Sequence, residues 1–177
     1  GLGRPAEAEA LFREAAALQR KVLGADDPGT LTSINNLALA LQAQGKSAEA
    51  EPYLREVLAA ERRINGEEHP DTLTSINTLG FVLQAQGKLA EAEPLYLEAL
   101  EKQRRVRGDG DVNTLTTINN LGSLWVAQGR YAEAMTLLEP AEAAMRAASG
   151  GPNATRQVAK LLASLGKARQ GTGDFEA

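Results

Sequence analysis

The chain has 177 residues, of which 43% are hydrophobic and 4% aromatic, and its formal net charge at pH 7 is −4. Acidic and basic side chains are interspersed, which argues against nucleic-acid binding because that function needs a basic face. The chain contains no cysteine, which excludes disulfides and thiol chemistry. No apolar run is long enough to cross a membrane, and the chain does not begin with a secretory leader. We therefore expect a cytoplasmic location, with neither a membrane nor a nucleic acid as partner.

The sequence repeats itself every 42 residues. The stretch Thr72–Glu101 reads TLTSINTLGFVLQAQGKLAEAEPLYLEALE, and it matches Thr30–Ala59 before it and Thr114–Ala143 after it. A fixed period of this length is typical of stacked-repeat proteins. Strong helix formers dominate the composition, and no stretch has the alternating pattern of a strand. The sequence therefore predicts an all-α fold.

Each repeat is predicted to hold two antiparallel helices, which we call helix A and helix B. Helix A begins after a residue that can cap its N-terminus; these residues are Asp27, His69 and Asp111. Helix A ends at a glycine suited to the left-handed backbone that often closes a helix; these are Gly45, Gly87 and Gly129. The following helix B is expected to be the longer of the two.

Three prolines fall within the predicted B helices. Pro52 and Pro94 are expected in the first turn, where a missing N–H removes no hydrogen bond. Pro140 lies further along its helix, so the sequence predicts a bend around Thr136–Pro140.

The pattern predicts a single solenoid over residues 1–177. Its parts are helix B of a partial repeat (1–24), three full repeats (27–66, 69–108 and 111–149) and helix A of a further partial repeat (153–177). We expect about seven helices in all. Because both ends interrupt a repeat, the chain is interpreted as a fragment whose exposed end faces support weak self-association.

The residues also resemble a known family. Small and large positions alternate as in the tetratricopeptide repeat (TPR), at Leu79, Gly80, Leu83, Gly87, Ala92, Tyr96 and Ala99. The 42-residue period, with the signatures HPDTL, INNLA and EAEPL, resembles the kinesin-light-chain subtype. That subtype also occurs in nephrocystin-type proteins and in the sensor arms of NLR-like STAND ATPases. The resemblance implies a right-handed α–α superhelical solenoid whose A helices line a concave, peptide-binding groove.

The resemblance also implies which residues face the groove. They are Thr32, Asn35, Leu39 and Gln42; Thr74, Asn77, Phe81 and Gln84; and Thr116, Asn119, Ser123 and Val126. The three Asn side chains suit a peptide backbone, because an amide both donates and accepts hydrogen bonds. Two alternatives stay open: the Asn residues could fix the spacing of the repeats, and Phe81 could fill the core between A helices. The final helix has Ala163 where a further Asn would fall.

No constellation of catalytic or metal-binding residues is present. His69 is the single histidine and is interpreted as a cap, since no cysteine or second histidine could complete a zinc or nucleophile site. Trp125 is interpreted as a packing residue in the seam between helices. We predict a non-enzymatic protein-interaction scaffold without a cofactor, the sensor or scaffold arm of a larger protein. The alternatives are the regulatory arm of an enzyme, such as a STAND ATPase or a protease, and a cargo adaptor.

Overall fold

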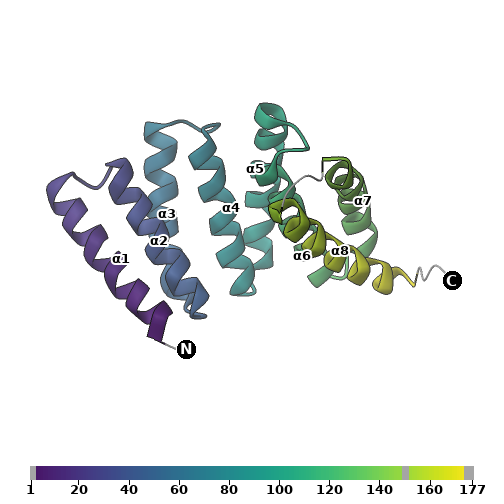
Figure 1. Cartoon of the computed structure of the whole chain (residues 1–177), viewed down its shortest axis with the longest axis horizontal. Helices are drawn as coiled ribbons and strands as arrows, with labels where there is room; N and C mark the ends of the chain where they lie inside the picture. Colours follow the sequence, from purple (N-terminus) through teal and green to yellow (C-terminus); the bar gives the residue numbers. More distant parts are fainter. Residues whose placement is uncertain (1–2, 149–151, 174–177) are drawn as a thin grey trace. The chain divides into compact units, whose positions relative to one another are not determined.

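A computed structural model describes residues 3–148 and 152–173 of the chain (Figure 1). The described residues form α-helices joined by short turns. The helices are α1 (Gly3–Val22), α2 (Pro28–Ala43), α3 (Ser47–Ile64), α4 (Pro70–Ala85), α5 (Leu89–Arg107), α6 (Val112–Ala127), α7 (Tyr131–Ala148) and α8 (Pro152–Thr172). The all-α prediction is confirmed for this part of the chain.

The sequence predicts about seven helices, and the described residues contain one more. Eight helices are described, because three helix pairs flanked by a single helix at either end already require eight. The helices A are α2, α4, α6 and α8, and the helices B are α1, α3, α5 and α7. Within the three pairs, each helix A has 16 residues, whereas the helices B have 18 or 19.

The helices divide into two compact units. The first unit, Gly1–Lys88, contains α1 to α4, and the second, Leu89–Ala177, contains α5 to α8. In the first unit, each helix packs against the next one along the chain. In the second unit the same order holds, and α6 also packs against α8. Each unit buries its own apolar seam, as at Ile34 and Val57 in the first unit and Leu121 and Leu138 in the second.

The predicted caps of the A helices are confirmed. Asp27 accepts hydrogen bonds from the backbone N–H groups of Gly29 and Thr30, at 2.9 and 3.2 Å. Asp111 caps α6 in the same way, and His69 accepts one bond through Nδ1. These side chains satisfy N–H groups that have no partner within the helix.

The glycine at the end of each helix A is left-handed, as predicted. Gly45, Gly87 and Gly129 have φ values of 77°, 76° and 76°. The N–H of the next residue then returns to a carbonyl of the last turn, for example from Lys46 to Leu41 at 3.0 Å. This closure sends the chain directly into helix B.

The prolines of helix B differ from expectation. Pro52 and Pro94 lie inside α3 and α5, past the first turn, because these helices begin at Ser47 and Leu89. Pro140 lies inside α7, which continues through it without a break. The bend around Pro140 stays a prediction.

Candidate functional site

The predicted groove residues of the first unit follow one face of α2 and the matching face of α4. Their spacing of three or four residues is that of a single helix face. Leu39 and Phe81 each keep 40% of their surface exposed, although both are large and apolar. The set comprises Thr32, Asn35, Leu39 and Gln42 on α2, and Thr74, Asn77, Phe81 and Gln84 on α4. All eight side chains are half-buried or exposed.

The polar groups on this face differ in how well they are paired. The Thr32 hydroxyl donates to the carbonyl of Pro28 at 2.8 Å, and the Thr74 hydroxyl donates to that of Pro70 at 2.9 Å. Both hydroxyls keep lone pairs that can still accept. The side-chain oxygen of Asn35 is shielded from water and has no hydrogen-bond partner. An unpaired buried oxygen of this kind is costly to the fold.

The predicted groove residues of the second unit lie on α6 and meet α8. Asn119 is only 8% exposed, and its side-chain oxygen accepts a hydrogen bond from the Ser164 hydroxyl at 3.1 Å. The hydroxyls of Ser123 and Ser164 lie 2.8 Å apart. Thr116 and Val126 are half-buried on the same helix. The structure therefore engages Asn119 and Ser123 with α8, and a ligand-binding role for them stays a prediction.

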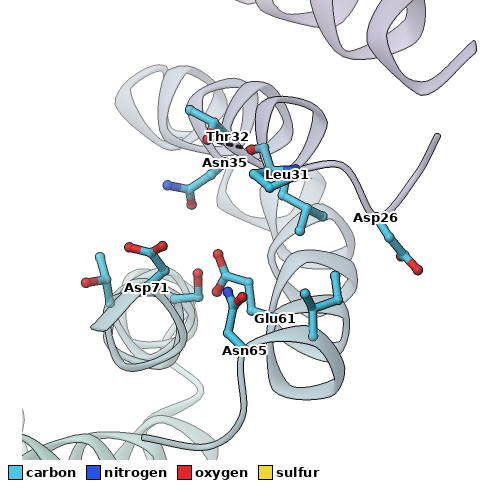
Figure 2. A pocket seen from close by; sticks show the side chains of 11 residues that line it. Asp26, Leu31, Thr32, Asn35, Glu61, Asn65 and Asp71 are labelled. Atoms are coloured by element: carbon cyan, nitrogen blue, oxygen red, sulfur yellow. Dashed lines mark hydrogen bonds between the residues drawn. The ribbon is translucent and has the colours of Figure 1, made fainter. Parts of the chain in front are cut away.

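A cavity of about 180 Å³ opens between α2, the end of α3 and the start of α4 (Figure 2). It overlaps the predicted groove at Thr32, Asn35 and Thr74. Figure 2 shows Asn35 on α2, Glu61 on α3 and Asp71 on α4 on three sides of it. The eleven lining residues, all within the described chain, are Asp26, Pro28, Leu31, Thr32, Asn35, Glu61, Ile64, Asn65, Asp71, Thr74 and Ser75. Three are carboxylates, and none is Lys, Arg or His.

Glu61 is the buried carboxylate of this cavity. Its residue is 9% exposed, and Oε2 has no hydrogen-bond partner. Burial raises the pKa of the Glu61 carboxyl above its usual value; the Asp71 carboxylate adds to the rise, while hydrogen bonding to Ser75 opposes it. A raised folded-state pKa means that this group lowers stability once the pH exceeds that pKa. The ionised Glu61 is therefore costly to hold at this buried position.

A second feature links successive repeats through a glutamate near the start of helix B. Glu51 accepts hydrogen bonds from Lys88 at 2.7 Å and from Gln86 at 2.9 Å, both in the turn that ends the next helix A. Glu9 binds Lys46 and Gln44 in the same way, each at 2.8 Å. We call this arrangement the glutamate clasp. The sequence pattern did not indicate it.

The clasp of the second unit includes an aromatic residue. Glu93 accepts hydrogen bonds from Arg130 at 2.6 Å and from the indole N–H of Trp125 at 2.8 Å. The Arg130 guanidinium lies 5.0 Å from the centre of the Trp125 ring, a cation–π distance. Trp125 is half-buried, whereas Leu41 at the same repeat position is fully buried. Trp125 therefore packs only in part, and its polar edge completes the clasp.

The clasp predicts how stability responds to acid. The Lys88 ammonium holds the pKa of Glu51 at about 2, against an ordinary value of 4.5. A lowered pKa contributes stability above the unfolded value, and this contribution is lost as the pH falls from about 4.5 to about 2. Glu51→Gln should therefore cost about 1–2 kcal/mol at pH 7. Thermal melting should show this loss shrinking towards zero as the pH approaches 2. Glu49→Gln, in the same helix but exposed, is the control; equal losses at both positions would contradict the assignment.

No group of three or more His, Cys, Asp or Glu side chains in the described part of the chain is arranged to hold a metal ion. None of the described helices has both the length and the apolar character of a membrane span.

The repeats of this chain match a known protein family. The sequence pattern described as "Tetratricopeptide repeat" matches residues 1–63, 35–80 and 71–147. A search of curated proteins finds no match. The structure resembles a crystal structure of a putative kinesin light chain with nearly identical TPR-like repeats from Podosopora anserina, with a TM-score of 0.81 and 29% identity. That match covers 97% of this chain and 80% of the other.

The structure is also similar to that of BtubC (BKLC) from P. vanneervenii. The TM-score is 0.85 at 26% identity, and the match covers 98% of this chain and 68% of the other. Both neighbours therefore match the whole run of helices.

Proposed function

Because this chain belongs to the tetratricopeptide repeat family, we propose that it is a non-catalytic scaffold that binds a peptide segment of a partner protein on its A helices. The face shared by α2 and α4 carries this proposal. Asn77 stands four residues before the exposed Phe81, and Asn35 has the same relation to Leu39. An amide can pair with any peptide backbone, and an exposed aromatic ring provides an anchor.

Peptide binding is better supported for the first unit than for the second. Its A-helix face keeps Leu39 and Phe81 exposed, whereas Asn119 on α6 is buried against α8. On α6 the predicted groove residues are Thr116, Asn119, Ser123 and Val126, and a ligand there would have to replace the contacts of Asn119 and Ser123 with Ser164. We therefore assign the principal binding surface to α2 and α4.

We infer that the chain acts as the sensor or scaffold arm of a larger protein. Its similarity to a putative kinesin light chain keeps a cargo adaptor as an alternative. The regulatory arm of an enzyme, such as a STAND ATPase or protease, is the other. The domains encoded beside this segment in the full-length gene separate these alternatives: a P-loop ATPase or protease domain favours the regulatory arm.

The outer face of α1 supports the further proposal of weak self-association. Leu11, Leu18 and Val22 are each more than half exposed there. A second copy of the chain could cover these side chains, as a neighbouring repeat does within the stack. Sedimentation at increasing concentration tests this, and a strictly monomeric chain at high concentration contradicts it.

The binding proposal predicts the effect of removing two amides. A library of random 12-residue peptides is selected on the purified chain, and the affinity of an enriched peptide is measured by calorimetry. Replacing Asn35 and Asn77 together with alanine should weaken binding about tenfold or more, because each lost hydrogen bond costs about 0.5–1.5 kcal/mol. Melting should stay nearly unchanged.

Asn36→Ala, one position along the same helix, is the matched control and should bind as the wild type does. Affinity that survives the double substitution, or a large fall in melting temperature, would favour the structural role of the Asn residues. Failure to enrich any peptide would count against the proposal itself.

A further inference from the structure

The cavity between α2, α3 and α4 contains a carboxylate at a position where neighbouring repeats have a neutral side chain. Glu61 occupies a repeat position that holds Gln19 one repeat earlier and Gln103 one repeat later. The side-chain oxygens of Gln19 and Gln103 also lack a partner, so an unpaired oxygen belongs to this position of the fold. The negative charge belongs to Glu61 alone. Since glutamine is accommodated at this position in two other repeats, stacking does not require a carboxylate there.

The surroundings of Glu61 also change between repeats. Asp71 corresponds to Gly29 in the preceding repeat and to Asn113 in the following one. Asn65 corresponds to Arg107 in the following repeat. The acidic, acceptor-rich character is therefore a property of this cavity and not of the repeat.

Among the side chains that face the cavity, some hydrogen-bond acceptors have no donor. Asp26 forms an ion pair with Arg63, and Asp71 lies 3.6 Å from the His69 ring. Glu61 has no such cationic partner on Oε2, and the Asn35 oxygen across the cavity is likewise unpaired (Figure 2). Two shielded acceptors in one cavity, one of them charged, favour a donor that also carries positive charge.

The volume of the cavity and its apolar lining indicate which kind of ligand it can hold. At about 180 Å³, the cavity far exceeds the space that one water molecule needs. Leu31 and Ile64 line it beside the polar groups, and they suit the methylene stem of a long basic side chain. Arginine offers several N–H donors in a fixed plane, which suits acceptors on different helices better than a single ammonium does.

We propose that this cavity recognises the basic side chain of a bound peptide, arginine in preference to lysine. Glu61 and Asn35 accept hydrogen bonds from its head group. Because Thr32, Asn35 and Thr74 belong both to the cavity and to the predicted peptide face, a peptide lying on that face can place one side chain in the cavity. The inference rests on the proposed peptide-binding function and adds the chemistry of the partner segment.

The test uses the complete chain, labelled with ¹⁵N, and small probes in place of an unidentified partner. N-acetyl-arginine amide is titrated into the protein, followed by the citrulline analogue, which has nearly the same shape but no charge, and by the lysine analogue. The expected result is a saturable shift of the side-chain amide signals of Asn35 and Asn65. Lysine should bind more weakly than arginine, and citrulline at least about tenfold more weakly, because hydrogen bonds to charged groups are the strong ones.

Variants assign the effect to Glu61. Glu61→Gln should weaken arginine binding at least about tenfold, whereas Glu49→Gln, which removes the same charge from an exposed site on α3, should leave it unchanged. Glu61→Gln should melt no lower than the wild type at pH 7, since the fold accepts glutamine at this position. Equal binding of arginine and citrulline, equal binding by the wild type and Glu61→Gln, or no shift at Asn35 and Asn65 would each overturn the inference.

The outcomes separate this inference from the proposed function. If selected peptides depend on Asn77 but neither they nor the arginine probe depends on Glu61, the scaffold function stands and the basic-side-chain inference fails. If the arginine probe binds at Glu61 but no peptide can be selected, recognition of arginine by the cavity stands and the proposed peptide-binding function fails.

Discussion

Replacing Gly122 with leucine is expected to destabilise the second unit by about 3 kcal/mol or more. A Cβ atom built on Gly122 would lie 2.5 Å from Cδ2 and 2.7 Å from Cγ of Leu138. Leu138 is fully buried in the seam between α6 and α7, so it has no open space into which to move. The gain in helix propensity on losing a glycine, about 1 kcal/mol, is too small to offset this clash. Urea unfolding measures the loss as a lower midpoint.

Gly166 provides the matched control for this prediction. It lies in α8 at the corresponding point of the last helix A, and a Cβ built there meets nothing within 4 Å. Gly166→Leu should therefore leave the midpoint unchanged or raise it slightly. If Gly122→Leu unfolded at the wild-type midpoint, the close packing of α6 on α7 would be wrong.

Replacing Pro140 with alanine is expected to stabilise the second unit by about 1–3 kcal/mol. Pro140 has no N–H, so the Thr136 carbonyl four residues earlier has no helical donor, and the proline ring crowds it. The side chain is exposed, which means that its removal leaves no cavity. The other two full repeats carry Glu56 and Glu98 at this position. A rise in melting temperature of about 2–4 °C per kcal/mol is the expected readout.

Pro70→Ala separates this effect from a general effect of losing proline. Pro70 is the first residue of α4, where the N–H would have no helical partner in any case. Its removal should bring no stabilisation. A Pro140→Ala protein that melts at or below the wild-type temperature would show that α7 has already adapted to the proline.

The fold was largely predictable because its requirements recur at fixed positions. A cap at Asp27, a left-handed glycine at Gly45 and a small residue at Ala50 are each local demands of the backbone or of close packing. Their recurrence at the same spacing gives the helix order. The position of Pro52 within α3 was missed because no side-chain cap marks where that helix begins.

The site was less predictable because its features depend on contacts between repeats. The sequence does not indicate which residue Glu51 contacts, and only the structure places Lys88 2.7 Å from it. Asn119 shares its sequence position with Asn35, yet α8 covers it. Glu61 gives no signal by itself; the comparison with Gln19 and Gln103 becomes informative once the cavity is known.

Whether the α2–α4 face is a peptide-binding surface is tested most directly by mapping a library-selected peptide onto the ¹⁵N-labelled chain by NMR. We expect saturable shifts centred on Asn35, Leu39, Asn77 and Phe81, and their loss in the Asn35→Ala, Asn77→Ala double variant. Shifts centred instead on the exposed apolar face of α1, around Leu11 and Leu18, would contradict it.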